Sequence, residues 1–252
     1  MKFLEKKNEH ERDKYLIFNE EKHEYYYKSQ KFNSVTTYIS KIFKEFNTEE
    51  CIHNLMNSRD WTKHELYGKT KEEIKEIWKK RNEHAIKEGV QLHQHIEYYL
   101  NNISVENSSV EFQYFQKFLN EHRSLSVYRT EWPIYDEDLK LAGTIDMCAI
   151  NPNNTLTLYD WKRTKSIRKT NYYKSYAIID YLSHIEDTNF NHYTLQLNLY
   201  KYILEKKYKR KVSKMYLVCL HPENKNKDYI IYNVDYKPRD IELVIKYIKE
   251  NN

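Results

Sequence analysis

The fold of this chain is decided by three adjacent stretches: Leu-Ala-Gly-Thr-Ile-Asp-Met-Cys-Ala-Ile at residues 141–150, Asn-Pro-Asn-Asn at 151–154, and Thr-Leu-Thr-Leu-Tyr-Asp-Trp-Lys at 155–162. The two outer stretches are rich in apolar and β-branched residues, and the middle one consists of residues that favour turns. Residues 127–135 form a similar strand-like run that ends at an acidic turn. These patterns predict three consecutive antiparallel strands.

Two carboxylates and a lysine come together in the predicted hairpin. Antiparallel pairing brings Asp146 close to Asp160, and the two-residue period of a strand places Asp160 and Lys162 on one face and Trp161 on the other. An acidic residue near a lysine on a strand is more often an ordinary surface pair. Here the pair ends a strand that is otherwise apolar, which favours a functional site.

The residues before these strands are predicted to be mostly helical. The expected elements are a small hairpin at residues 15–28 around a polar turn at 19–21, a helix from Ser34 to Phe43, two helical segments between residues 71 and 101 interrupted at Gly89, and a helix over residues 111–121.

The residues after the hairpin complete a mixed architecture. The expected elements are a helix at 194–207, strands at 215–220 and 229–234, and a helix at 239–249. Their order predicts an α/β (α+β) fold, with a mixed central sheet of about five strands flanked by helices and an N-terminal helical extension. We expect residues 1–80 to form the extension and residues 81–252 the core, in one compact unit.

The composition indicates an intracellular protein. The longest apolar runs fall far short of the roughly 20 residues of a membrane-spanning helix, and the N-terminus turns charged at once, so neither a membrane segment nor secretion is expected. Cys51, Cys148 and Cys219 are too widely spaced for a disulfide framework, which favours a reducing compartment such as the cytoplasm, the nucleus, an organelle or a viral factory. The Lys, Asn, Ile and Tyr content is typical of an AT-rich genome.

The paired acids favour metal-dependent chemistry. Two carboxylates directed at one point repel each other unless a cation lies between them, and hard oxygen ligands favour Mg²⁺ or Mn²⁺. Such an ion can hold a scissile phosphate and activate a water, while Lys162 orients that water or neutralises charge that develops on the phosphate. The sequence therefore predicts phosphodiester hydrolysis with one or two metal ions.

Further motifs stand in a fixed order around this pair. They are Gly89-x-x-x-His93-x-x-x-Glu97, Glu131 on the preceding strand, Gly143-x-x-Asp146, Asp160-x-Lys162, and Gln196-x-x-x-Tyr200 on the following helix. In this order they resemble the PD-(D/E)XK nuclease superfamily, and in particular its RecB-like exonuclease branch, which includes lambda-type exonucleases and mitochondrial genome maintenance exonuclease. The resemblance covers residues 89–200 and implies a restriction-endonuclease-like core.

The resemblance also implies roles for these residues. His93, Asp146 and Asp160 are expected to be metal ligands. Glu97 is either a further ligand or a residue that orients His93 or a water on the metal. Glu131 either completes a second metal position or holds Lys162.

Two neutral residues are expected to support the site. Gln196 and Tyr200 could donate hydrogen bonds to a phosphate oxygen or to Lys162 and its neighbours, although residues four apart on a helix also pair for purely structural reasons.

The segment after Lys162 is expected to bind nucleic acid. Its cationic and aromatic residues are Arg163, Lys165, Arg168, Lys169, Tyr172, Tyr173 and Lys174, with no acid before Asp180. Cations would neutralise phosphates, and tyrosines could stack on unpaired bases, although a solvated charged loop would look similar. A net charge of +5 suits a polyanionic partner but does not establish one.

The expected substrate is DNA, either single-stranded or with free ends. The chain has no base-reading motif, no four-cysteine iron–sulfur arrangement and no phosphate-binding Gly-rich loop, so we expect neither a cluster nor a nucleotide cofactor. Any replication or recombination partner would be a separate chain. Two alternatives stay open: an RNA endonuclease of the cap-snatching type, and a non-catalytic nucleic-acid-binding module with a nuclease core.

Overall fold

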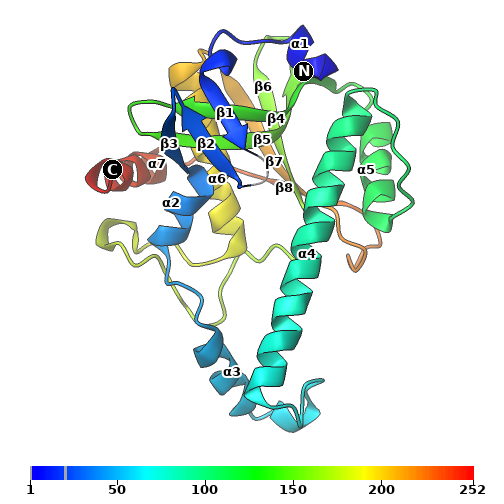
Figure 1. Ribbon diagram of the computed structural model, residues 1–252, viewed down its shortest axis with the longest axis vertical. Coiled ribbons are helices and arrows are strands. Elements are labelled where there is room, and N and C mark those ends of the chain that lie inside the picture. Colours follow the sequence, from blue (N-terminus) through cyan, green and yellow to red (C-terminus); the bar gives the residue numbers. More distant parts are fainter. Residues whose placement is uncertain (1, 20–21) are drawn as a thin grey trace. The chain divides into compact units, whose positions relative to one another are not determined.

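The computed structural model describes residues 2–19 and 22–252. Glu20 and Glu21 of the predicted polar turn lie outside the described residues. The strands are β1 (Leu16–Asn19), β2 (Glu24–Tyr27), β3 (Gln30–Ser34), β4 (Ser126–Asp136), β5 (Leu141–Ile150), β6 (Leu156–Lys162), β7 (Val212–Cys219) and β8 (Ile230–Asn233). The helices are α1 (Phe3–Lys7), α2 (Val35–Ile42), α3 (Thr48–Met56), α4 (Lys71–Leu100), α5 (Val110–Glu121), α6 (Asn189–Lys207) and α7 (Pro238–Glu250). They are labelled in Figure 1.

The central sheet is mixed, as predicted. β5 pairs antiparallel with both β4 and β6, which confirms the three consecutive strands. β7 runs parallel to β6 and antiparallel to β8. The five predicted core strands are therefore β4 to β8. Within the described residues the N-terminal hairpin and β3 extend this sheet to eight strands, because β3 pairs in parallel with the start of β5.

β3 and β6 share one edge of β5. The other edge is taken by β4 along its whole length. On the shared edge, β3 pairs with Leu141 and Ala142, whereas β6 pairs only from Met147 onward. Residues 143–146 lie between these two pairings. On the N-terminal side of Met147 the strands β5 and β6 are no longer paired, and there the Asp146 carboxylate accepts a hydrogen bond from the peptide N–H of Trp161.

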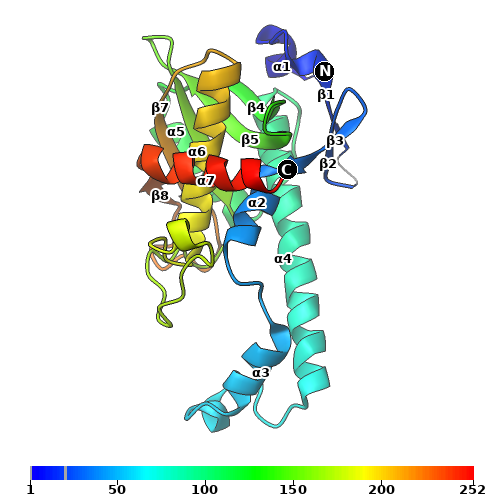
Figure 2. The same cartoon turned by 90° about the vertical axis from the view of Figure 1, so that its left-hand side faces the viewer.

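Two apolar layers cover the faces of the sheet. Residues of α2, α6 and α7 pack on one face, where Leu158 and Leu217 are fully buried. α5 and the C-terminal part of α4 pack on the other, where Phe115 and Trp161 are buried. Figure 2 shows α6 and α7 together on the first face. This alternation fixes which way each strand residue points, and it confirms that Trp161 faces away from Asp160, which contacts α6.

The predicted interruption at Gly89 is wrong, because α4 runs without a break from Lys71 to Leu100. A glycine inside a helix costs about 1 kcal/mol relative to alanine, which flanking helix-forming residues can offset. Apart from its chain neighbours and the adjacent backbone of α4, no atom of the described residues lies within 4 Å of where a Cβ of Gly89 would stand, so packing does not require a glycine there.

The chain forms two compact units, one of residues 1–44 and 92–252 and the other of residues 45–91. The smaller unit contains α3 and the first part of α4 and has its own small core of Ile52, Leu66 and Ile74. The division into residues 1–80 and 81–252 stays a prediction, and these compact units have other boundaries. No helix among the described residues is long and apolar enough to span a membrane.

Candidate metal centre

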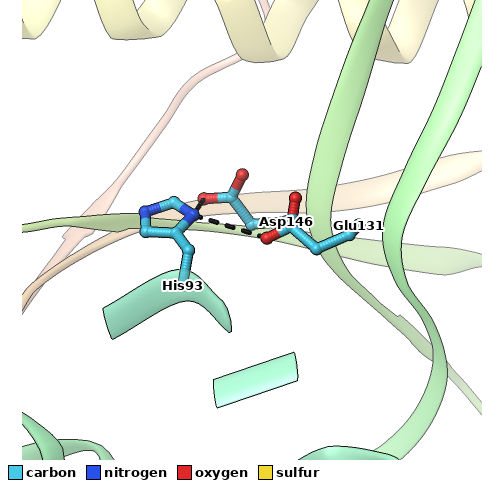
Figure 3. Close-up of side chains that lie close together, drawn as sticks. All are labelled: His93, Glu131 and Asp146. Atoms are coloured by element: carbon cyan, nitrogen blue, oxygen red, sulfur yellow. Dashed lines mark ion pairs between the residues drawn. The ribbon is translucent and has the colours of Figure 1, made fainter. Parts of the chain in front are cut away.

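Three side chains from separate elements converge beside the gap between β5 and β6. His93 comes from α4, Glu131 from β4 and Asp146 from β5. Their ligand atoms all lie within 4.8 Å of one another. Figure 3 shows the imidazole of His93 pointing at both carboxylates, with Nδ1 lying 3.4 Å from Glu131 Oε1 and 3.6 Å from Asp146 Oδ2. A nitrogen and two carboxylate oxygens thus face one point.

The peptide backbone of β6 sets the orientation of His93. The ring atom Nε2 lies 3.0 Å from the carbonyl oxygen of Trp161. A carbonyl can only accept a hydrogen bond, so Nε2 carries a proton and Nδ1 is the atom available to a metal ion. A histidine that binds a metal through one nitrogen commonly donates its other N–H in this way.

Glu131 reaches the centre from a strained backbone. Its φ is +41°, inside a strand where the neighbours Thr130 and Trp132 pair regularly with β5. A positive φ is unfavourable for a residue with a Cβ, and such strain gathers at functional sites. The conformation brings the carboxylate close to His93.

Asp160 and Lys162 form an ion pair next to this group, in which Asp160 is buried and Lys162 is half-buried. Lys162 Nζ lies 2.7 Å from Asp160 Oδ2, and Gln196 on α6 donates a hydrogen bond of 3.3 Å from Nε2 to Asp160 Oδ1. Gln196 Nε2 also lies 3.1 Å from the hydroxyl of Tyr200. The structure therefore brings Gln196 and Tyr200 to the same site as the acidic pair, whereas their roles there stay predictions.

The ring of Tyr200 fills the space that a side chain at residue 143 would occupy. A Cβ at residue 143 would stand 2.5 Å from Tyr200 Cε1. We expect Gly143→Ala to lower the free energy of unfolding by about 1–3 kcal/mol, the usual cost of overpacking. Urea unfolding would measure this. Gly143→Ala should cost clearly less in a Tyr200→Leu background, and an equal cost in both backgrounds would contradict the steric explanation.

The charges of the centre are unbalanced without a cation. Burial raises the pKa of Asp146, as does the nearby carboxylate of Glu131, against the lowering effect of His93. Burial also raises the pKa of Asp160 to about 6, although Lys162 opposes this shift. Burial lowers the pKa of His93, but Asp146 and Glu131 outweigh it and raise the value to about 9. Buried carboxylates that resist ionisation are the environment a divalent cation would relieve.

The donor set fits a divalent cation. Carboxylate oxygens suit Mg²⁺ and Mn²⁺, and the imidazole nitrogen is better suited to Mn²⁺ than to Mg²⁺. His93, Glu131 and Asp146 would hold the ion, with Asp160 as the next carboxylate along the sheet.

Metal binding is expected to release a proton from His93. Below its pKa of about 9 the imidazole of the metal-free protein is protonated, and a cation must displace that proton. Affinity should therefore rise with pH and level off above about 9. In the metal-free protein the same shift stabilises the fold below the ordinary pKa of 6.5, and this contribution is lost as the pH rises through about 9.

Calorimetric titration with Mn²⁺ in buffers of different ionisation enthalpy would count the protons released. About one proton per ion is expected near neutral pH. Proton release that persists unchanged in His93→Ala would mean that another group titrates.

Other residues with predicted roles have protein partners. Glu97 is buried on α4 and forms an ion pair with Lys2. Its role as a metal ligand stays a prediction. Arg163 lies largely buried against Glu111 of α5, with Nη2 and Nε each 2.7 Å from Glu111 Oε1. The guanidinium of Arg163 thus fixes α5 to the end of β6, and this contact competes with the predicted role in binding nucleic acid.

The rest of the predicted binding segment is more exposed. Lys165 pairs with Glu223 at 2.8 Å and remains largely exposed. Lys174 lies 4.0 Å from Glu186, and Lys169 Nζ lies 4.8 Å from the centre of the Phe190 ring. Arg168 is anchored through its backbone, since its N–H donates to Asn189 Oδ1 at 2.7 Å.

One aromatic contact at the site, between Lys162 and Tyr193, was not predicted from the sequence. Lys162 Nζ lies 4.5 Å from the centre of the Tyr193 ring. Tyr193 stands three residues before Gln196, so the helical spacing of Tyr193, Gln196 and Tyr200 along one face was the available signal.

The mixed sheet flanked by helices, with paired acids on adjacent strands, defines a restriction-endonuclease-like core. The family model of the PD-(D/E)XK nuclease superfamily matches residues 35–251. The chain belongs to this superfamily. His93, Glu131 and Asp146 form a candidate acidic metal site of the kind that is typical of these nucleases.

Comparison with known proteins adds little beyond the family. No curated protein matches the sequence. The chain is similar to a solved structure described as "Crystal structure of SSO0001", with 14% identity over 56% of this chain and 55% of that one and a TM-score of 0.31. The match thus spans about half the length of that protein.

Proposed function

We propose that this protein is a metal-dependent DNA nuclease, and specifically an exonuclease that acts on DNA ends or single strands. One observation carries the proposal: the ligand atoms of His93, Glu131 and Asp146 meet beside the ion pair of Asp160 and Lys162. Such a set of groups is suited to stabilising negative charge on a phosphate, because preorganised charges act strongly in a partly buried site.

Each residue has a distinct part in the proposed reaction. Bound Mg²⁺ or Mn²⁺ would supply Lewis-acid stabilisation of the scissile phosphate. Lys162 neutralises charge that develops on that phosphate, and its side chain is only partly exposed. Asp160 forms an ion pair with this ammonium group, and Gln196 holds Asp160 by donating a hydrogen bond to it.

Tyr172 and Tyr173 are proposed to contact the substrate. Their side chains are 92% and 86% exposed, and their rings meet edge to face with centroids 5.4 Å apart. Asn171 holds the turn beneath them, since its Oδ1 accepts a hydrogen bond from Tyr173 N–H and its own Nδ2 donates to the Asp187 carbonyl oxygen. Exposed rings on an anchored turn are suited to stacking on unpaired bases.

Removing these rings is expected to weaken binding of single-stranded DNA. Tyr172→Ala and Tyr173→Ala should each raise the Kd about 10-fold or more, since one stacked base contributes about 1–3 kcal/mol. Fluorescence anisotropy with a labelled oligonucleotide would measure the effect. Tyr236→Ala, which also removes an exposed tyrosine, is the matched control. Unchanged affinity in both loop variants would remove this loop from the proposed interface.

Cleavage assays with linear and circular DNA test the function itself. End-labelled linear DNA and circular DNA, each single- and double-stranded, would be incubated with Mg²⁺, Mn²⁺ or EDTA. Metal-dependent loss of linear DNA alone supports an exonuclease, and cutting of circles makes the protein an endonuclease. Preferential cleavage of single-stranded RNA in parallel reactions would favour the RNA endonuclease. Metal binding without cleavage of any substrate would indicate a binding module.

A further inference from the structure

We infer that Tyr193 is a positioning residue, whose ring holds the ammonium group of Lys162 in place beside Asp160. This inference rests on the proposed nuclease function. It concerns an aromatic side chain of α6 that lies outside the metal-binding group, and the centre of its ring is 4.5 Å from Lys162 Nζ.

α6 presents a row of side chains to the site. Tyr193, Gln196 and Tyr200 follow one another at spacings of three and four residues, so they share one face of the helix. Gln196 contacts Asp160, and Tyr200 covers the backbone at Gly143. Tyr193 is the member of this row that faces Lys162.

Lys162 needs more than one contact to be fixed. Its ammonium group sits at the end of a long, flexible stem, and one ion pair with Asp160, at 2.7 Å, leaves it free to turn about that oxygen. A second carboxylate, Asp146, also attracts it. The face of an aromatic ring attracts a cation and so restricts the positions that the ammonium group can take. Asp160 and the ring together therefore define where the charge lies.

The position of the ring is itself well determined. Tyr193 is half-buried and packs against the core beneath α6. The helix begins at Asn189 and is capped by Thr188, whose side chain accepts a hydrogen bond from Asn191 N–H. Tyr193 thus lies within the first two turns of a capped helix, and its ring is a rigid support for a flexible lysine.

Kinetics of paired variants test this role. Tyr193→Leu removes the ring and is expected to lower kcat about 10-fold while KM and the Mn²⁺ affinity change little. Tyr193→Phe keeps the ring and should retain kcat within about 3-fold. Tyr202→Leu, a half-buried tyrosine of the same helix, is the control and should keep the activity of the unchanged protein. Tyr193→Gln is a second ring-free variant if Tyr193→Leu does not fold.

A double variant separates positioning from a direct role. If Tyr193 acts through Lys162, adding Tyr193→Leu to Lys162→Met should cause no further loss. A further loss, or a Tyr193→Phe variant as slow as Tyr193→Leu, would overturn the inference, because the tyrosine or its hydroxyl would then act independently of the lysine.

An NMR measurement tests the contact without relying on activity. With lysine labelled at Cε, the ring should shift the Hε signal of Lys162 upfield, and the signal is assigned by its loss in Lys162→Met. It should move to an ordinary position in Tyr193→Leu and stay in Tyr193→Phe. An unshifted signal in the unchanged protein would overturn the inference. An upfield signal without cleavage of any nucleic acid would instead refute the nuclease function and leave the contact established.

Discussion

Asp146→Asn is expected to abolish metal binding and cleavage together, with a loss of cleavage on the order of 10³-fold or more. The Asp146 carboxylate contacts both His93 and the backbone of β6. Its Oδ2 lies 3.6 Å from His93 Nδ1 and accepts a hydrogen bond of 2.8 Å from Trp161 N–H. Asparagine can keep the bond to the backbone, so the variant removes the charge and leaves the local structure in place.

Asp146→Asn should be at least as stable as the unchanged protein without metal and less stable than it when metal is added. Burial and Glu131 raise the pKa of Asp146, so its charge near neutral pH is unfavourable in the metal-free protein. Asp146→Asn should therefore melt no lower than the unchanged protein in EDTA. In saturating Mn²⁺ only the unchanged protein should gain stability, by about 2–4 kcal/mol for an ion present at 100 to 1,000 times its Kd.

Thermal melts, calorimetry and cleavage assays on one preparation would check this prediction. Asp138→Asn is a suitable control, because Asp138 is an exposed acid that pairs with Lys207 away from the site. A variant that still melts higher with Mn²⁺, or still cleaves, would show that Asp146 is not a ligand.

The local part of the fold could be predicted from the sequence. The hairpin of β5 and β6 follows from two apolar runs and a turn, and the two-residue period correctly places Asp160 with Lys162 and Trp161 on the opposite face. These features depend on neighbours in the sequence, which is where patterns are informative.

The non-local part could not be predicted. β3 joins the sheet through residues 33 and 34, which pair with residues 141 and 142 more than a hundred positions away. The hydrophobic periodicity of the sequence does not indicate such a pairing. The positive φ of Glu131 is also set by its tertiary surroundings, since glutamate has no intrinsic preference for that region.

The start of α6 shows how a small boundary error hides a residue. The sequence pattern predicts a helix from residue 194, but the structure begins it at Asn189, after the cap at Thr188. Tyr193 therefore fell outside the predicted helix. The spacing of three residues places Tyr193 on the face of Gln196 only if the helix begins before residue 193, as it does in the structure.

Lys162→Met is expected to lower the rate of cleavage about 10²- to 10³-fold while leaving metal binding intact. Lys162 is not among the ligand atoms that converge on the metal centre. Its contacts are with Asp160 and the ring of Tyr193. Methionine keeps much of the length and apolar volume of the lysine stem and removes only the charge, so in the metal-bound protein the loss should appear in kcat.

Lys162→Arg should not restore activity, because a planar guanidinium distributes its charge differently from an ammonium group. Lys201→Met is the matched control. Lys201 is a buried lysine of α6 that pairs with Glu205 at 2.7 Å, so its loss should affect stability without affecting cleavage per folded molecule.

Comparing Mn²⁺ affinity and kcat in these variants separates two roles for the lysine. Removing Lys162 leaves Asp160 buried without its cation, so the pKa of Asp160 should rise beyond about 6 and the metal-free variant should lose stability as the pH rises into the neutral range. Bound metal would offset that loss. If kcat falls and Mn²⁺ affinity is kept, Lys162 acts on the substrate. If affinity falls in parallel with kcat, the lysine instead supports the metal centre, and the proposed charge neutralisation at the phosphate is wrong.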